Sequence, residues 1–451
     1  MLKVLLPDNH HAERSYITRV LLEEFLGLAI SITYSPGSGK TEITLENGRQ
    51  LFIDDHLFHA FPTPLSYLRQ ENIPASIARL SRSGCPFLPE EDLPVIYGQP
   101  SVFTGAETVH CGVDIFASAF FMLTRWEEYV REERDVHGRF PAKASLAFKG
   151  NFLHRPIVNE MTEMLWAMLV YLGIEQEREK KPFTAVITHD VDFPLQWRSP
   201  FSLVKKLGGD LLKRRSAKEA LRSLDSYMHT KTGKEKDPFD TFDYLMALSE
   251  KHGHQSHFFF LCGGTSAFDK GHLPPGHPFL QHLMKRIDER GHIIGFHPSY
   301  HTYLNPALFK KELELLQQHS PQEIRCGRQH FLRFAAPTTW QLWEENGMAW
   351  DSTVYYAEAA GFRCGCCRVF PVFNFLNRQT LRLREVPLTM MEGTYLNYLK
   401  FSPEQMMEEA KRTLEAVKSY KGTFVLLWHN SVINLPEWQP YRKVYEQLLD
   451  L

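Results

Sequence analysis

The second half of the chain repeats one pattern, in which a short apolar run, typical of a buried strand, ends abruptly in polar or ionisable residues. The runs are AVITHDVD, SHFFFL, HIIGFHP, IRCGRQHFLRF, MAWDSTV, LREVPLTM and TFVLLWHN, all between residues 185 and 430. Segments with helical periodicity separate most of them, which predicts an α/β fold with parallel strands joined by crossovers. Because the polar residues all fall at strand C-terminal ends, where barrels build their sites, we expect a seven-stranded (β/α) barrel.

The first part of the chain indicates a separate, smaller domain. Residues 1–178 alternate β-branched runs with helical patterns, which predicts an α/β or α+β domain of unknown role. The charged run EQEREKKP, ending at Pro182, has the composition of a linker. We therefore place the barrel at 183–451, with a helical insertion near 196–240 that is rich in Lys, Arg and Ser.

Composition excludes several classes of function. Lysine and arginine number 51 against 53 acids, so the chain has no overall electrostatic attraction to nucleic acid. No window approaches the roughly 20 apolar residues of a transmembrane helix, and the N-terminal apolar run is too short for a signal peptide. With an odd count of seven cysteines, these features favour a cytoplasmic protein with reduced thiols. The sequence leaves the oligomeric state open.

One cysteine cluster needs separate consideration. Cys364, Cys366 and Cys367 lie close together in the chain. They lack a second Cys or His pair at zinc-finger spacing, so we do not expect a structural zinc ion there.

Two aspartates end the first apolar run. Asp190 and Asp192 are two residues apart, so in a strand they share one face. Two close carboxylates are costly unless a cation or a raised pKa relieves their repulsion. The alternative is that these aspartates cap a helix or turn before Phe193 and Pro194.

Two histidines follow the HIIGF run. His297 and His301 are four residues apart, and on one helical turn both could reach a single ion. With 21 histidines in the chain, a chance pair at this spacing is expected, so the position at a predicted strand end carries the hypothesis. A carboxylate with two imidazoles would leave open positions on the ion, as catalytic sites require.

The ordered motifs ITHDVD, SHFFFL, RGHIIGFHPSYH, HFLRFAAPTTW and VLLWHNS resemble the polysaccharide deacetylase family, also called carbohydrate esterase family four, over about residues 183–435. The resemblance implies a seven-stranded β/α barrel and one divalent ion, expected to be Zn²⁺, with Co²⁺, Ni²⁺, Mn²⁺ or Fe²⁺ as alternatives. It also implies a hydrolase that removes the acetyl group from an N-acetylated amino sugar in a polysaccharide, an oligosaccharide or its precursor.

Carried onto this chain, the resemblance assigns roles to five residues. Asp190 would be the base, and Asp192, His297 and His301 would bind the ion. His429 would be the acid, although a lone histidine after an apolar run is more often a satisfied core residue.

The chain departs from the commoner family pattern, in which the two aspartates are adjacent. Val191 separates them here, a D-x-D form, so the roles of base and ligand could be exchanged. For the arginine that holds the base ionised we expect Arg333, with Arg328 as the competitor. For the aspartate that orients the acid we expect Asp351, whose alternative role is a helix N-cap.

Three other functions stay open. The same residues could hydrolyse another C–N bond in a small amide, because barrels lend one site to many substrates. The barrel could instead bind carbohydrate without catalysis, although a silent site needs no general acid. Finally, the N-terminal domain could be the functional unit and the barrel its scaffold.

Overall fold

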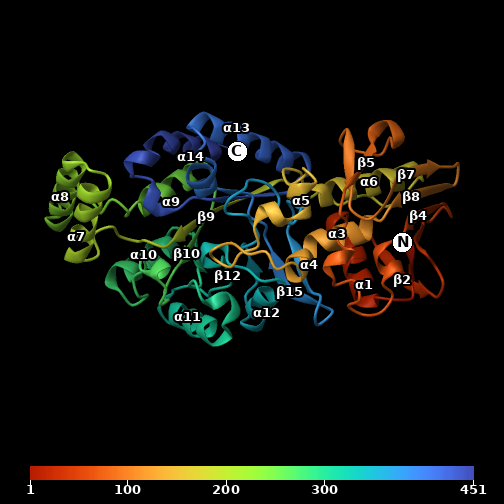
Figure 1. The fold of residues 1–451 in the computed structure, drawn as a ribbon, viewed down its shortest axis with the longest axis horizontal. Coiled ribbons are helices and arrows are strands. Elements are labelled where there is room, and N and C mark those ends of the chain that lie inside the picture. The colour runs from red at the N-terminus through yellow and green to blue at the C-terminus, as the bar shows by residue number, and fades with distance from the viewer. Residues whose placement is uncertain (451) are drawn as a thin grey trace.

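The computed structural model describes residues 1–450 and shows a mixed α/β protein built on two large sheets (Figure 1). The sheet of the N-terminal part lies at one end of the long axis and the sheet of the C-terminal part lies beside it. One continuous hydrophobic core includes buried residues of both parts. The α/β class predicted from the sequence is therefore confirmed.

The N-terminal part contains a six-stranded mixed sheet. Its strands lie in the order β2 (Ile30–Ser35), β1 (Leu2–Pro7), β3 (Lys40–Thr44), β4 (Gln50–Asp54), β8 (Thr108–Val113) and β7 (Gly98–Thr104). The β1–β2 and β4–β8 pairs are parallel, and the other pairs are antiparallel. Strands β5 (Ala78–Ser81) and β6 (Asp92–Val95) form a separate two-stranded antiparallel sheet. The helices of this part are α1 (His11–Arg19), α2 (Leu57–Ala60), α3 (Ile115–Thr124), α4 (Trp126–Val130), α5 (Leu146–Lys149) and α6 (Ile157–Tyr171).

The C-terminal part is built on a nine-stranded sheet. Its strands lie in the order β14 (Phe370–Asn374), β15 (Gln379–Glu385), β13 (Trp350–Asp351), β12 (Cys326–Gly327), β11 (Ile293–Phe296), β10 (Ser256–Phe260), β9 (Thr184–Val191), β17 (Thr423–Leu427) and β16 (Met390–Met391). All neighbouring pairs are parallel except β14 with β15.

The predicted closed barrel of seven strands is not confirmed. Within residues 1–450 no strand pairing joins β16 to β15 or β14, so the sheet has two edges. Strands β12, β13 and β16 have only two residues each, so they offer few backbone N–H and C=O groups for the strand pairing that a closed barrel needs. The β14–β15 hairpin adds an edge strand that the sequence analysis did not include.

Amphipathic helices surround this sheet. They are α9 (Phe242–Lys251), α10 (Pro278–Glu289), α11 (Pro306–His319), α12 (Thr338–Glu345), α13 (Pro403–Ser419) and α14 (Arg442–Leu448). Helix α13 shows why such segments are helical. Ser402 and Gln405 form a capping box, Pro403 occupies the first turn, and Met406 and Ala410 begin the buried stripe.

The segment between β9 and α9, within the predicted insertion 196–240, is helical. It consists of α7 (Pro200–Gly208), the π-helical turn η5 (Gly209–Lys213) and α8 (Ala217–Lys231). In Figure 1, α7 and α8 project at the end of the molecule opposite the N-terminal sheet.

The two parts pack against each other through buried contacts. Tyr16 of α1 stacks on Phe373 of β14 with ring centroids 4.8 Å apart, and its hydroxyl donates to Pro371 O at 2.8 Å. Glu128 of α4 lies between the guanidinium groups of Arg125 and Arg363, and all three side chains are buried. The N-terminal part is thus joined to the larger sheet by both apolar and ionic contacts.

Candidate metal centre

Functional side chains gather at one edge of the larger sheet, where its parallel strands end. Asp190 and Asp192 lie at the end of β9, where Asp190 is paired in register with Phe259 of β10. His297 follows β11 directly, and His429 lies two residues beyond β17. Because parallel strands present their carboxyl ends at the same edge, residues far apart in sequence meet there.

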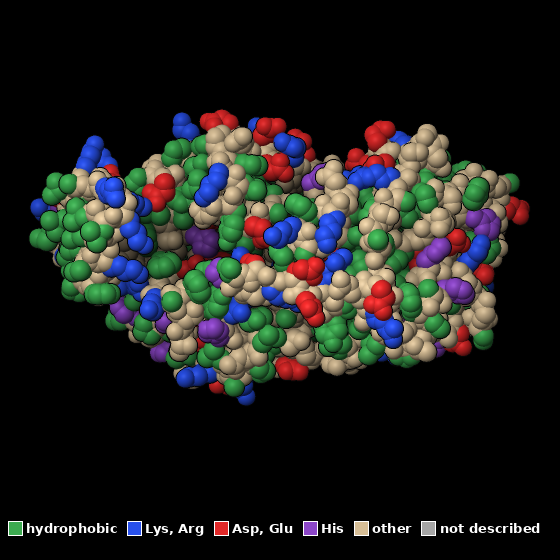
Figure 2. Space-filling model, in the orientation of Figure 1, with side chains coloured by type: hydrophobic (Ala, Val, Ile, Leu, Met, Phe, Trp, Pro, Cys, Tyr) green, Lys and Arg blue, Asp and Glu red, His purple; other side chains and the backbone are tan. Residues whose placement is uncertain are grey.

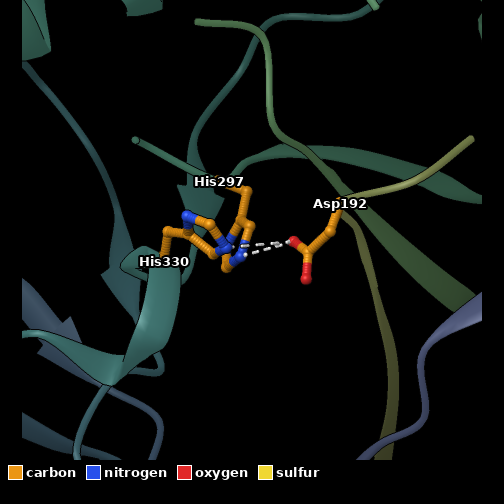
Figure 3. Close-up of side chains that lie close together, drawn as sticks. All are labelled: Asp192, His297 and His330. Atoms are coloured by element: carbon orange, nitrogen blue, oxygen red, sulfur yellow. Dashed lines mark ion pairs between the residues drawn. The ribbon is translucent and has the colours of Figure 1, made fainter. Parts of the chain in front are cut away.

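Asp192, His297 and His330 form the one group among residues 1–450 whose ligand atoms lie close enough to hold a metal ion. One atom from each lies within 4.8 Å of the others. The Asp192 Oδ1 atom is 3.2 Å from His297 Nε2 and 3.7 Å from His330 Nε2. Figure 3 shows both imidazoles pointing toward this carboxylate oxygen.

Hydrogen bonds fix the orientation of both imidazoles. His297 Nδ1 lies 2.5 Å from Arg328 O, and His330 Nδ1 lies 2.9 Å from Asp269 Oδ1. Because these partners accept hydrogen bonds, each Nδ1 carries the proton and each Nε2 offers its lone pair to the site. The Asp269 carboxylate is itself held by Tyr300 N at 2.9 Å.

The group has the electrostatics of a cation site. Asp192 Oδ1 is buried without a hydrogen-bond donor, and it faces two imidazole nitrogens that are acceptors in this tautomer. Burial raises the pKa of Asp192, but the neighbouring imidazoles of His330, His297 and His429, when they are protonated, lower it by more, so the pKa lies well below the usual range and the carboxylate is ionised. Three converging acceptors, one of them ionised, are relieved by a divalent cation.

The third member of this group differs from the sequence prediction. His301 is exposed and lies outside the group, because Pro298 and the following residues form an irregular loop rather than one helical turn. The spacing of four therefore does not bring His297 and His301 to one point. His330 takes the third place. In the sequence His330 lies inside the run IRCGRQHFLRF, which predicts one strand, so no strand end marks this histidine.

Asp190 is paired with a buried arginine. Arg328 Nη1 donates to Asp190 Oδ1 at 2.8 Å and to Thr188 Oγ1 at 3.0 Å. Its Nε donates to Ser352 O at 2.9 Å, and its Nη2 donates to Ser352 Oγ at 3.1 Å. Asp190 Oδ2 is 3.7 Å from His297 Nε2, so this carboxylate borders the metal group and has the Arg328 guanidinium as its ion-pair partner.

Arg333, the predicted partner of Asp190, has a different place. Its Nη1 donates to Tyr300 O at 2.5 Å and its Nε to His137 O at 2.7 Å. The guanidinium lies 4.0 Å from the ring centroids of both Tyr300 and Tyr303. Arg333 therefore fastens the loop that carries His137 to the C-terminal part, and Arg328 takes the position beside Asp190.

His429 borders the metal group from the other side. Its Nε2 is 3.7 Å from Asp192 Oδ2, and its Nδ1 is hydrogen-bonded to the buried carboxylate of Glu392. Burial lowers the pKa of His429, but Glu392 and the two aspartates of the site raise it to about 10. The imidazole is therefore protonated at neutral pH and can donate a proton.

Glu392, and not Asp351, is the carboxylate beside His429. Asp351 is fully buried at the end of β13, where it accepts a hydrogen bond from Thr353 Oγ1 at 2.5 Å. Burial raises its pKa to about 7. The LREVPLTM run predicts one strand and gives no sign of Glu392, which in the structure directly follows the short strand β16.

A pocket of about 200 Å³ opens over these groups. Asp190, Asp192, His297, His330 and His429 line one side of it. The remaining lining is partly apolar and partly polar, and consists of Arg139, Phe331, Leu332, Ala357, Met391, Gly393, Asn397 and Tyr398.

The N-terminal part contributes one residue to the pocket, Arg139. Asp135 Oδ1 accepts from the backbone N–H groups of His137 and Arg139, which folds residues 135–139 into a tight loop. Asp135 Oδ2 accepts from Arg139 Nε at 2.8 Å, and Arg139 Nη1 donates to Phe331 O at 3.0 Å. The loop thus places the nearly buried guanidinium group of Arg139 in the wall of the pocket.

The cysteine cluster takes no part in the site. Cys364, Cys366 and Cys367 are buried free thiols, and burial raises the pKa of each. The helices of residues 1–450 include none with the length and apolarity needed to span a bilayer.

Comparison with known proteins gives a family match for the N-terminal part. A family of unknown function, DUF7033, matches residues 2–173, which is less than half of the chain. No curated protein matches the chain significantly.

Several solved structures are weakly similar to the chain. A candidate polysaccharide deacetylase from Mycobacterium smegmatis has 15% identity and a TM-score of 0.37, with 60% of this chain and 84% of that chain covered. A CE4 family pseudoenzyme from Bacillus anthracis has 9% identity and a TM-score of 0.30, with 59% and 60% covered. A polysaccharide deacetylase from Bacillus cereus has 14% identity and a TM-score of 0.26, with 59% and 87% covered. TM-scores below 0.5 support no conclusion about function, so function has to be inferred from the site.

Proposed function

We propose that this protein is a metal-dependent hydrolase that removes the acetyl group from an N-acetylated amino sugar. One observation carries the proposal: Asp192, His297 and His330 converge on one point, with the Asp190–Arg328 pair on one side and the His429–Glu392 pair on the other. A ligand group, a carboxylate that can act as base and a protonated imidazole that can act as acid are the parts that amide hydrolysis needs.

The proposed ligands are Asp192, His297 and His330, where His330 replaces His301 as the third ligand. One carboxylate and two imidazoles suit Zn²⁺ and similar divalent ions, and they leave coordination positions open. When bound, such an ion would act as a Lewis acid, polarising an amide carbonyl and lowering the pKa of a water.

The flanking pairs supply the proton transfers. Asp190, held in place by its hydrogen bond from Arg328, accepts the proton of the attacking water. His429, held protonated by Glu392, donates a proton to the departing amine nitrogen. The bond between the carbonyl carbon and nitrogen breaks, and the products are acetate and a free amino sugar.

The pocket fits a small acyl group. Leu332, Ala357 and Met391 offer an apolar wall to the acetyl methyl group, beside the polar metal group. A volume of about 200 Å³ lies below the roughly 300–1,000 Å³ of most ligand pockets, so one acetamido group with part of its sugar ring fits.

The test is acetate release. Purified protein is incubated with N-acetylated hexosamines, free and in oligosaccharides, and with small non-sugar amides at matched concentration. We expect metal-dependent acetate release from the sugars, abolished by a chelator and by Asp190→Asn. Preference for the non-sugar amides would favour a different C–N hydrolase. Metal binding without turnover on any amide would favour a silent carbohydrate-binding protein.

A further inference from the structure

The projecting helices α7 and α8 expose an unusual amount of apolar surface. Nineteen large hydrophobic side chains are exposed in the part of the chain described, and seven of them lie between residues 201 and 228. Figure 2 shows hydrophobic side chains gathered over this end of the molecule, with Lys and Arg side chains among them. Single exposed apolar residues are ordinary, but a concentrated patch indicates an interaction surface.

The exposed residues follow helical spacing on each helix. In α7 and η5 they are Phe201, Val204, Leu211 and Leu212, which are 73%, 63%, 51% and 81% exposed. In α8 they are Leu221, Leu224 and Met228, spaced as i, i+3 and i+7. Each helix therefore turns an apolar stripe outward, although the apolar stripe of a surface helix normally faces the core.

The same segment carries a one-sided charge. It contains six basic residues and one acid between positions 198 and 215. These are Arg198, Lys205, Lys206, Lys213, Arg214 and Arg215, with Asp210 as the acid. Asp210 is buried, where Lys206 and Arg214 lie 3.4 Å and 3.3 Å from its Oδ1. Over residues 199–231 as a whole, eight Lys and Arg residues stand against three Asp and Glu residues, so the exposed surface is apolar and basic.

The helical pair is a built element with a fixed base. Ser223 Oγ donates to Asp210 Oδ2 at 2.7 Å, which ties α8 to η5. At the base, Asp237 accepts from Gln196 N at 2.7 Å and from Trp197 N at 2.8 Å, so both ends of the insertion are held together. The outward stripes are therefore a property of a folded hairpin.

We propose that residues 199–231, the docking hairpin, bind the surface of an anionic phospholipid membrane. An amphipathic helix with Phe and Leu on one face and Lys or Arg beside them lies in the lipid interface, and each basic residue near an anionic leaflet contributes about 1 kcal/mol. A second copy of the chain fits less well, because it would oppose one basic surface to another and protein interface cores are poor in Lys.

The hairpin lies close to the metal centre. A groove of about 610 Å³ is lined by Ser202, Lys206 and Arg214 from the hairpin and by Phe193 from the main body. Phe193 directly follows the ligand Asp192. Membrane docking would therefore hold the centre near the lipid surface. The docking proposal is independent of the proposed hydrolase activity.

Vesicle flotation tests the proposal. Full-length protein is mixed with vesicles of pure phosphatidylcholine and with vesicles that also contain phosphatidylglycerol, at low and high salt. We expect flotation with the anionic vesicles alone, weakened by salt. Lys213→Gln with Arg215→Gln should lower partitioning about fivefold per charge removed. Leu211→Ser with Leu212→Ser should lower it roughly tenfold or more.

Matched controls separate docking from general stickiness. Phe103→Ser on β7 removes a side chain that is 68% exposed, and Lys285→Gln removes an exposed charge on α10; both should float as the wild type does. Absence of wild-type flotation, or unchanged flotation of the Leu211/Leu212 variant, overturns the proposal. A dimer that this variant dissociates, without vesicle binding, would instead assign the hairpin to self-association.

Discussion

At the scale of single residues, the carboxylates around His429 keep its imidazole protonated well above neutral pH. Its pKa is raised to about 10, so an activity that needs the protonated imidazole should fall as pH rises through that value. Glu392→Gln removes a negative charge that raises the pKa of His429, while burial continues to lower that pKa. The fall in activity should therefore move to lower pH. The measurement is kcat/KM against pH for both proteins. His429→Ala should cost about 10²–10⁴-fold at pH values below the pKa of His429, and the difference from the wild type should shrink above it. An unmoved profile in the Glu392 variant would contradict this role.

Arg328→Met and Arg333→Met are matched variants that test the ion pair of Asp190, the proposed base. Arg328→Met leaves the Asp190 carboxylate buried and unpaired, which should lower the free energy of unfolding by about 3–5 kcal/mol. Arg333→Met leaves that ion pair intact and should cost less. Denaturant unfolding of both variants measures the difference. Asp190→Asn in the Arg328→Met background should recover part of the loss. If Arg333→Met lost as much free energy of unfolding as Arg328→Met, or more, the Asp190–Arg328 ion pair would not be the larger contributor to stability.

Four of the five aspartates and histidines that line the pocket could be predicted from the sequence. The structure brings Asp190, Asp192, His297 and His429 together around the pocket. Each of them comes at the end of an apolar run long enough to be recognised as a strand, and this made their positions predictable. His330 follows β12, a strand of two residues inside a longer mixed run, so its place at a strand end was not visible. The His297–His301 spacing suggested a helical turn that the loop does not form.

At the scale of elements, the close approach of β11 and β12 positions His297 and Arg328. A Cβ atom at Gly327 would lie 1.8 Å from Phe296 O, so only glycine fits there. Gly327→Ala should separate the two strands, lower stability and weaken metal binding. Gly208→Ala in α7 is the control, because its Cβ would meet nothing within 4 Å. Thermal unfolding with metal titration measures both effects. Tight metal binding by Gly327→Ala would show that this approach does not position the ligands.

The same scale explains which parts of the fold were predictable. Strands β9, β10, β11 and β17 were recognised from dense apolar runs of parallel-sheet type. Strand β14, with sequence FPVFN, was missed because it is short and contains a proline, a residue typical of edge strands. Closure of the sheet is a long-range property of strand pairing, and no local pattern determines it.

At the scale of the whole molecule, the N-terminal part completes the pocket. Arg139 stands on the pocket wall and keeps donor capacity beyond its bonds to Asp135 and Phe331. Arg139→Ala should raise KM about tenfold or more while metal content stays unchanged, since bonds from charged donors contribute about 1.5–3 kcal/mol. Val136→Ala, at the exposed tip of the same loop, is the control. Unchanged KM in Arg139→Ala would leave this part with a purely structural role.

The most direct test of the account is the metal content of three proteins: wild type, His330→Ala and His301→Ala, measured by elemental analysis after loading with Zn²⁺ and desalting. The geometry predicts about one ion per chain in the wild type and in His301→Ala, and loss of the ion in His330→Ala with the fold retained. Loss in His301→Ala with retention in His330→Ala would contradict the ligand group, and absence of the ion from the wild type would contradict the metal centre itself.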